Sequence, residues 1–359
     1  MRILVTGGAG FIGSHYVRRV LTGAYPQTAG AEVTVLDKLT YSGNPANLDP
    51  VAGSPRLRFV VGDICDPAVV DQVMAGQDLV VHFAAESHVD RSIQGAAPFV
   101  TTNVVGTQVL LDAALRHRVD RFVHVSTDEV YGSIATGAWT EEQPVAPRSP
   151  YSAAKAGSDL LALAYHTTHG LPVVVTRCSN NYGPYQFPEK IIPLFITNLL
   201  DGLPVPLYGD GGNVRDWLHV DDHCTGIALV AAGGRPGEVY HIGGGTELTN
   251  QELTARLLAA CGAGWEMVEY VADRKGHDRR YALDTRKISD ELGYAPRVDF
   301  ATGLAETVAW YRANRAWWEP LRERAALPGQ PAPRERTVSE GGPAREPVAL
   351  PGAGAGHVR

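Results

Sequence analysis

Short apolar runs alternate with helical patterns along residues 1–178. The apolar runs are rich in β-branched residues, and the stretches between them repeat their apolar positions with the period of a helix. Strands that are buried on both faces and separated by helices indicate an α/β fold with a doubly wound parallel sheet. The predicted strands are Ile3–Thr6, Val33–Leu36, Arg58–Val61, Leu79–Phe83, Phe122–Ser126 and Val173–Thr176, and the predicted helices are Phe11–Leu21, Pro67–Met74, Phe99–Leu115 and Tyr151–His169.

The alternation of apolar runs and helical stretches ends after Arg177. Loop-like segments rich in Asn, Gly, Pro and Tyr alternate there with a few predicted helices, such as Ile191–Asp201 and Asn250–Cys261. We expect residues 1–178 to form one domain, to which part of 220–242 returns, and residues 179–318 to form mainly a smaller C-terminal lobe. Residues 319–359 are mostly Ala, Pro, Gly, Arg and Glu, so we expect a disordered tail.

Composition and charge narrow the class of protein. Hydrophobic residues make up 44% and charged residues 20% of the 359, as in ordinary soluble proteins. The net charge of −7 argues against general nucleic-acid binding. No apolar run is long enough to span a bilayer and no signal peptide is evident, and the four cysteines form no CxxC pair, so we expect a cytoplasmic protein with reduced thiols.

A glycine-rich loop directly follows the first predicted strand and opens the first predicted helix. Gly7, Gly10 and Gly13 fit the pattern GxxGxxG. Glycine at these places permits a tight turn, close approach of the backbone to a pyrophosphate and close packing of helix on strand. The free N–H groups of the helix then face the phosphates. The loop predicts a dinucleotide site in a Rossmann-like sheet.

Acidic residues after the next two strands refine the choice of dinucleotide. Asp37 ends the second strand, where a carboxylate accepts hydrogen bonds from a ribose diol and repels a 2′-phosphate. NAD is therefore expected, although the neighbouring Lys38 could tolerate the phosphate. Asp63 is placed near the adenine edge, with a helix N-cap before Asp66-Pro67 as the competing interpretation of that stretch.

Tyr151 and Lys155 form a YxxxK pair whose i, i+4 spacing places both side chains on one helix face. An ammonium near a phenol favours the phenolate, which can take a hydroxyl proton as hydride leaves the same carbon. A predicted strand ending in Ser126-Thr127 precedes the pair. We expect Thr127 to contact the substrate hydroxyl, and Ser126 to support the nicotinamide end.

These residues resemble the extended short-chain dehydrogenase/reductase family, and the resemblance covers about residues 1–318. Segments 37–44, 84–90, 126–132 and 273–281 are close to the pattern of its dTDP-glucose 4,6-dehydratase subgroup. The resemblance implies a lyase of deoxysugar biosynthesis that uses NAD, oxidises C4 of dTDP-glucose, eliminates water across C5–C6 and returns hydride to C6. It also implies a homodimer, through helices carrying Val100, Val104, Leu110, Leu111, Leu160, Leu161 and Leu163.

Asp128 and Glu129 distinguish this chemistry from simple oxidation. Elimination needs a base for the C5 proton, which the C4 ketone acidifies, and an acid for the leaving hydroxyl. Glu129 suits the base, and Asp128 suits the acid if burial or its anionic neighbour raises its pKa.

The resemblance also implies binding residues, which the structure must bring together. Arg215 and Arg274 match positions that clamp the substrate diphosphate, and Asn250 is either a sugar-nucleotide contact or a helix N-cap. The substrate-binding set is Ser87, Thr127, Asn180, Lys190, Leu207, Tyr208, Arg215, Asn250, Arg274, His277 and Tyr281. The cofactor-binding set is Gly7, Gly10, Phe11, Ile12, Gly13, Asp37, Lys38, Leu39, Thr40, Asp63, Ile64, Phe83, Ala84, Ala85, Ser87, Thr102, Ser126, Tyr151, Lys155 and Asn181.

Other interpretations remain open. A nucleotide-sugar 4-epimerase has the same fold without dehydration, a GDP-mannose 4,6-dehydratase differs in nucleotide base, and an NAD-binding regulator would lack catalysis. His219 and His223 have the i, i+4 spacing of zinc ligands, but residue 220 is Val and no third ligand is evident, so no metal is expected.

Overall fold

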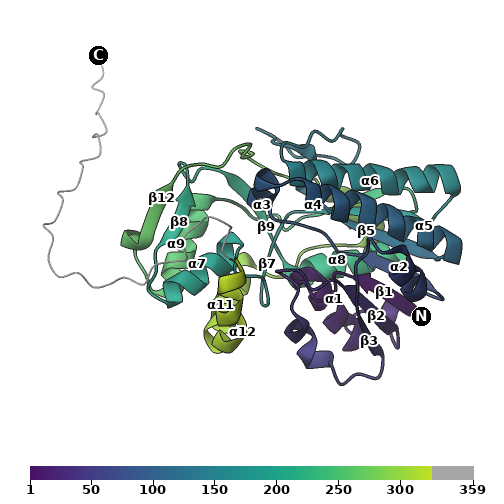
Figure 1. Cartoon of the computed structure of the whole chain (residues 1–359). Helices are drawn as coiled ribbons and strands as arrows, with labels where there is room; N and C mark the ends of the chain where they lie inside the picture. The colour runs from purple at the N-terminus through teal and green to yellow at the C-terminus, as the bar shows by residue number, and fades with distance from the viewer. Residues whose placement is uncertain (326–359) are drawn as a thin grey trace, which may run out of the picture.

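A seven-stranded sheet in which every pairing is parallel forms the centre of the larger lobe (Figure 1). The computed structural model describes residues 1–325. The strand order is β10-β6-β5-β4-β1-β2-β3, which confirms the predicted doubly wound α/β fold. The strands are β1 (Arg2–Thr6), β2 (Glu32–Asp37), β3 (Leu57–Val61), β4 (Leu79–His82), β5 (Arg121–Thr127), β6 (Val173–Cys178) and β10 (Val239–Ile242).

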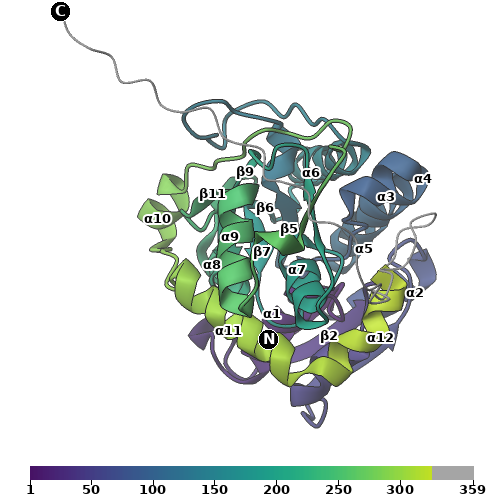
Figure 2. The same cartoon turned by 90° about the vertical axis from the view of Figure 1, so that its left-hand side faces the viewer.

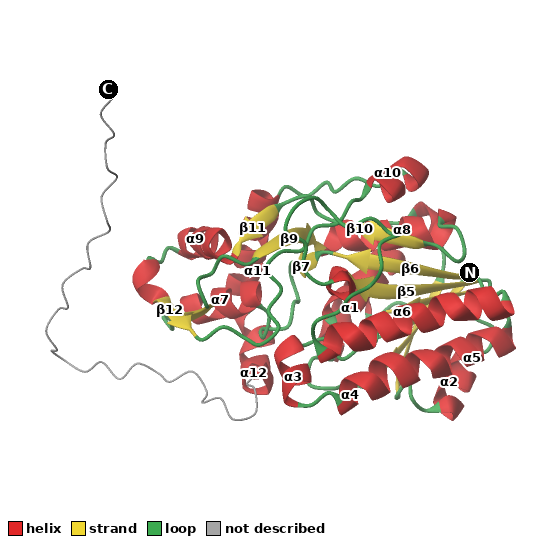
Figure 3. Ribbon diagram, turned by 90° about the horizontal axis from the view of Figure 1, so that it is seen from above, coloured by secondary structure: helices red, strands yellow, loops and turns green. Residues whose placement is uncertain are grey.

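Helices cover both faces of this sheet, as Figure 3 shows. One face is packed by α1 (Phe11–Leu21), α8 (Val220–Gly233) and α10 (Arg286–Leu292). The other is packed by α2 (Pro67–Met74), α5 (Thr107–His117) and α6 (Pro150–His169). Helices α3 (Val89–Gln94) and α4 (Ala97–Val100) lie on the α5 and α6 side, and a π-helical segment, Thr101–Gly106, joins α4 to α5.

The smaller lobe has two small sheets that the apolar pattern did not predict. Strands β7 (Asn180–Tyr182), β9 (Val214–His219) and β11 (Glu247–Thr249) form one, and β8 (Val205–Tyr208) pairs with β12 (Val268–Val271) in the other. Helices α7 (Ile191–Leu200), α9 (Asn250–Cys261) and α11 (Phe300–Ala313) pack around them on a core that includes Phe195, Trp217, Leu253 and Leu304. Short 3-10 turns lie at Pro26–Thr28, Pro45–Val51, Asp128–Tyr131 and Trp265–Met267.

The predicted tail begins later than expected. Helix α12 (Arg315–Ala325) follows α11 directly (Figure 2), and its Trp318 and Leu321 are buried. Residues 319–325 therefore belong to a helix, and Trp318 of this helix packs into the core of the smaller lobe. The remainder of the predicted tail, residues 326–359, lies outside the described residues.

A membrane-spanning helix is not found in the described part of the chain, where no helix combines the length and the apolar character that a bilayer requires.

Candidate functional site

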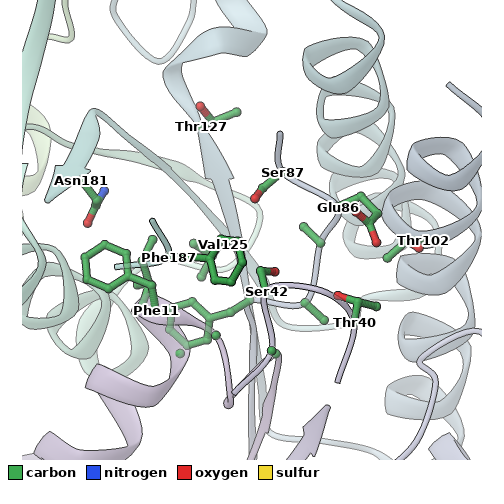
Figure 4. A pocket seen from close by; sticks show the side chains of 18 of the residues that line it. Phe11, Thr40, Ser42, Glu86, Ser87, Thr102, Val125, Thr127, Asn181 and Phe187 are labelled. Atoms are coloured by element: carbon green, nitrogen blue, oxygen red, sulfur yellow. The ribbon is translucent and has the colours of Figure 1, made fainter. Parts of the chain in front are cut away.

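A cavity of about 300 Å³ opens at the carboxyl ends of β1, β2, β4 and β5. This is the edge at which the strand order reverses between β1 and β4, the usual place for a ligand in such sheets. Figure 4 shows side chains from both lobes around it, with Phe11 and Thr102 from the larger lobe and Asn181 and Phe187 from the smaller. The site therefore lies between the two lobes.

The glycine loop approaches the neighbouring backbone too closely for any side chain. A Cβ on Gly13 would lie 2.3 Å from Gly7 O, and one on Gly7, whose φ is +69°, would lie 2.6 Å from Ala84 N. Gly10 precedes α1, and no side chain caps this helix. Its first N–H groups are free to bind phosphate oxygens at the cavity wall.

Two carboxylates and a lysine line the end of the cavity beside β2 and β3. Asp37 accepts hydrogen bonds from Ala9 N (2.9 Å) and Leu39 N (2.8 Å), while burial raises its pKa. Lys38 Nζ lies 2.5 Å from Asp63 Oδ2, and this hydrogen bond raises the pKa of Lys38. Lys38, the neighbour of Asp37 that could have tolerated a 2′-phosphate, is thus paired with a carboxylate.

The helix N-cap in the same stretch is Asp66, whose Oδ1 accepts from Ala68 N at 2.9 Å. Asp63 instead lines the cavity, so the two competing interpretations apply to different residues.

Tyr151 and Lys155 both line the cavity from α6 and are almost fully buried. Lys155 Nζ donates to Val125 O at 2.7 Å. Burial, with the neighbouring Glu129 next in effect, raises the pKa of Tyr151 well above its ordinary value. This direction is opposite to the one expected from Lys155 alone, because desolvation of the phenolate dominates.

Asp128 and Glu129 begin the 3-10 turn that follows β5. Asp128 is 2% exposed, and burial and then the charge of Glu129 raise its pKa well above the ordinary range. Burial also raises the pKa of Glu129, although Arg274, Lys190 and Arg215 oppose it. The two neighbouring carboxyl groups therefore have different surroundings: Asp128 is buried against the charge of Glu129, whereas Glu129 is also under the influence of three cations.

Several buried polar atoms of this cavity have no partner within residues 1–325. They are Ser126 Oγ, Asp128 Oδ2 and Asn180 Oδ1. Buried polar atoms normally form hydrogen bonds, so these three atoms are suited to a polar ligand in the cavity.

The cavity wall includes every residue of the predicted cofactor-binding set except Leu39. Leu39 adopts a left-handed φ of 55° and donates its N–H to Asp37, so it shapes the loop without lining the cavity. Of the predicted substrate set, Ser87, Thr127, Asn180 and Lys190 line the wall. The others lie outside it, in the smaller lobe: Leu207, Tyr208, Arg215, Asn250, Arg274, His277 and Tyr281.

Two of these outer residues act on the site electrostatically. Arg215 and Arg274 both lower the pKa of Glu129. Arg215 is buried, lies 4.2 Å from the centre of the Tyr281 ring and donates to Asp278 O at 3.0 Å. Their charges therefore favour the carboxylate form of Glu129.

Asn250 is the first residue of α9, whose N-cap is Thr249. Thr249 Oγ1 accepts from Glu252 N at 3.1 Å. The interpretation of Asn250 as an N-cap is therefore wrong.

Glu189 contributes a buried carboxylate to the cavity wall and was not among the predicted site residues. Tyr41 donates to it at 2.9 Å and Arg91 at 3.3 Å, so this residue connects the loop after β2 and helix α3 of the larger lobe to the smaller lobe. In the sequence, only its position next to Lys190, a predicted substrate-binding residue, pointed to a role for Glu189 at the site. The other wall residues that were not predicted are Leu36, Ser42, Gly43, Gly62, Glu86, Val125, Cys178, Ser179, Gln186 and Phe187, while the predicted catalytic residues Asp128 and Glu129 do line the wall.

The two histidines with zinc-like spacing have other partners. His223 Nδ1 lies 2.9 Å from Asn181 Oδ1, and His219 Nδ1 accepts from Asp221 N. Within residues 1–325, no group of three metal-ligating side chains occurs.

Comparison with known proteins gives one consistent family. The family profile described as GDP-mannose 4,6 dehydratase matches residues 4–307. A dTDP-glucose 4,6-dehydratase of Streptomyces niveus is 68% identical over 331 residues, 92% of this chain and 98% of that protein. The crystal structure of the dTDP-glucose 4,6-dehydratase DesIV of Streptomyces venezuelae, with NAD and dTDP bound, is 67% identical and superposes with a TM-score of 0.89 over 89% of this chain and 100% of that one. A UDP-glucose 4-epimerase of Thermotoga maritima, crystallised with UDP-glucose, is 33% identical with a TM-score of 0.81 over 88% of this chain and 100% of that one.

Proposed function

This chain belongs to the GDP-mannose 4,6-dehydratase family, and from that premise we propose that it is a dTDP-glucose 4,6-dehydratase. It converts dTDP-glucose to dTDP-4-keto-6-deoxyglucose and water, with NAD as cofactor. The observation that carries the proposal is the pair Asp128 and Glu129, a buried acid and a cation-surrounded carboxylate in the same cavity as Tyr151 and Lys155. A dehydratase needs Tyr151 and Lys155 for oxidation of C4 and an acid and base pair for the elimination of water.

The cavity fits NAD on three observations. The uncapped α1 and its side-chain-free glycine loop suit the pyrophosphate, Asp37 suits a ribose diol, and Ser126 Oγ has no other partner among the described residues. When bound, NAD supplies the hydride acceptor for C4, the hydride donor for C6 and a positive charge beside Tyr151. Pairing of Lys38 with Asp63 leaves Asp37 to exclude a 2′-phosphate.

The side chains of the protein account for every proton in the reaction. Thr127 orients O4, and Tyr151 takes the O4 proton as C4 is oxidised, in the phenolate form that Lys155 and the positive charge of bound NAD would favour against burial. Glu129 takes the C5 proton, Asp128 protonates O6 as it leaves as water, and Glu129 returns the proton to C5. Tyr151 then holds one proton more and Asp128 one fewer, and proton exchange between them resets the site.

The outer cations are assigned to the nucleotide. Arg215 and Arg274 bind the diphosphate, with Lys190, Tyr208 and His277 around it, while Asn250, Leu207 and Tyr281 complete the substrate pocket in the smaller lobe. We propose on this basis that residues 1–178, with part of 220–242, hold the cofactor and that residues 179–318 mainly hold the nucleotide sugar.

Incubation of the purified protein with dTDP-glucose tests the proposal. The expected product is a 4-keto sugar, detected by the absorbance that such sugars develop in alkali, without net release of reduced cofactor. A 4-epimerase would instead give dTDP-galactose, and parallel incubation with GDP-mannose and UDP-glucose tests the choice of base. The epimerase is the weaker candidate, because its reaction requires no acid and base for elimination.

Replacing Gly13 by alanine should weaken NAD binding by about tenfold or more, because the added Cβ would lie 2.3 Å from Gly7 O and displace the loop. Isothermal titration with NAD measures the effect. Gly53→Ala is the matched control, since a Cβ there meets no atom within 4 Å. Equal NAD affinity in both variants would contradict the assignment of the loop.

A homodimer is part of the proposal, through the outer face of α3 to α6. Large apolar side chains are exposed there on neighbouring helices: Ile93 (39%), Val100 (49%), Val105 (45%) and Leu160 (55%). Leu110 and Leu111, which the sequence suggested for this face, are instead fully buried in the core on that side of the sheet. An exposed apolar patch of this kind suits a subunit interface.

Leu160→Glu should weaken the dimer more than about tenfold, because an unpaired carboxylate would be buried in the interface. Light scattering at micromolar protein should give a dimer mass for the wild type and a lower mass for the variant. Tyr270→Glu, at an exposed apolar residue of the smaller lobe, should leave the mass unchanged.

The proposed compartment is the cytoplasm. The four cysteines are free, and Cys178 and Cys224 are buried, which suits a reducing environment.

A further inference from the structure

Helix α6 carries a third buried charged residue on the face of Tyr151 and Lys155. Asp159 follows Lys155 by four residues and Tyr151 by eight, so the three side chains leave the same side of the helix. Asp159 is 0% exposed and does not line the cavity. It is therefore placed to act on Lys155 without contacting a ligand.

The Asp159 carboxylate faces side chains from the neighbouring strands β5 and β6. Arg177 Nε on β6 donates to its Oδ2 at 2.9 Å, and His124 Nε2 on β5 lies 3.2 Å from its Oδ1. Arg177 also donates to Tyr131 OH at 2.5 Å. The ion pair with Arg177 thus ties Asp159 of α6 to β6 through one carboxylate oxygen.

Lys155 is a buried cation with no carboxylate within ion-pair distance among residues 1–325. Its Nζ donates to the neutral Val125 O. A buried ammonium tends to lose its proton unless negative charge lies nearby. The proposed mechanism requires the ammonium, because it stabilises the Tyr151 phenolate.

We propose that Asp159 is a positioning residue for catalysis: its buried carboxylate keeps Lys155 protonated and anchors α6 to β5 and β6. The inference rests on the proposed function. Burial lowers the pKa of Lys155, and the charge of Asp159 is the first effect that opposes this. A role for Asp159 as a partner of Arg177 alone would leave Lys155 unaffected.

The other groups facing this part of α6 cannot replace that charge. Burial lowers the pKa of His82 and of His124, so both imidazoles are neutral near pH 7. Burial raises the pKa of the Cys178 thiol, so it too is neutral. Arg177 is cationic, and burial raises the pKa of Asp128, which favours its uncharged form. Asp159 therefore supplies the negative charge next to Lys155 on this side of α6.

The test is a direct titration of Lys155. The chain has five lysines, at positions 38, 155, 190, 275 and 287, so labelling with ¹³Cε-lysine gives a simple NMR spectrum, and the spectrum of Lys155→Met assigns the Lys155 signal. In Asp159→Asn the pKa of Lys155 should fall by about one unit or more. The alkaline decline of C4 oxidation should move to lower pH by the same amount.

Two further variants separate charge from structure. Ser158→Ala removes the hydrogen bond between Ser158 and His124 in the same network but no charge, so the pKa of Lys155 should stay at its wild-type value. Asp159→Asn/Arg177→Gln removes the ion pair together, which avoids an unpaired buried guanidinium, and the lowered pKa of Lys155 should persist.

A wild-type pKa for Lys155 in Asp159→Asn or in the double variant would overturn the inference. A Lys155 that is already neutral at pH 7 in the wild-type protein would also overturn the inference, and this result can be seen without any variant. Failure of the proposed function is a different result: the wild type would form no keto sugar, while the NMR titration could still be read.

Discussion

Tyr151→Phe is expected to lose oxidation of C4, with a rate at least about 10²- to 10⁴-fold below that of the wild type. No other base lines the cavity next to Lys155 on the same helix face, within the described residues, to take the O4 proton. Single-turnover absorbance of the reduced nicotinamide measures this step. Its amplitude should be absent in the variant, while NAD affinity should change little, because the phenylalanine ring fills the same space.

Lys155 offers a comparison for Tyr151. Lys155→Met should also slow oxidation, but it should weaken NAD binding as well, because Lys155 belongs to the proposed cofactor-binding residues and lines the cavity. A Tyr151→Phe enzyme that still reduces bound NAD at the wild-type rate would show that another group takes the proton.

Asp128→Asn and Glu129→Gln are expected to fail after oxidation and at different points. Asp128→Asn should oxidise C4 and exchange the C5 proton with solvent, but should expel water about 10²- to 10⁴-fold more slowly, because an amide is a poor proton donor. Glu129→Gln should oxidise C4 but exchange C5 hydrogen poorly. Solvent-deuterium incorporation at C5, measured beside nicotinamide absorbance, distinguishes the two variants.

The raised pKa of Asp128 gives the elimination a pH dependence. The residue acts in its acid form, and a raised pKa preserves that form near neutral pH. Elimination should therefore slow as pH rises through this pKa, and Asp128→Asn should lose that dependence. Wild-type turnover in both carboxylate variants would remove the dehydratase assignment and favour an epimerase.

The larger lobe could be predicted because its local signals agree with its fold. Strands β1, β2, β4, β5 and β6 are mostly buried on both faces, and Gly10 and Pro67 mark helix starts that the structure reproduces at Phe11 and Pro67. The glycine loop, Asp37 and the YxxxK pair follow these elements directly. Their convergence follows from the rule that parallel strands end at one edge of the sheet.

The smaller lobe could not be predicted in the same way. Strand β9 contains Arg215, Asp216 and His219, all of which are buried. Because these residues are polar, the sequence pattern did not indicate a buried strand there. These side chains are satisfied by distant partners: Ser179 donates to Asp216, and Arg215 donates to Asp278 O. Such partners exist only after tertiary folding, and the same holds for Glu189, which is fixed by Tyr41 and Arg91.

The place of β10 bears on how the chain folds during its synthesis. This strand pairs with β6, yet the two are separated in the sequence by most of the first small sheet and by α7 and α8. Until residue 242 has left the ribosome, β6 remains an unpaired sheet edge with Val173, Val174 and Val175 on it, a surface prone to pairing with other chains. The larger lobe therefore cannot complete its sheet before much of the smaller lobe has been synthesised. A fragment ending at Cys178 should aggregate when expressed alone.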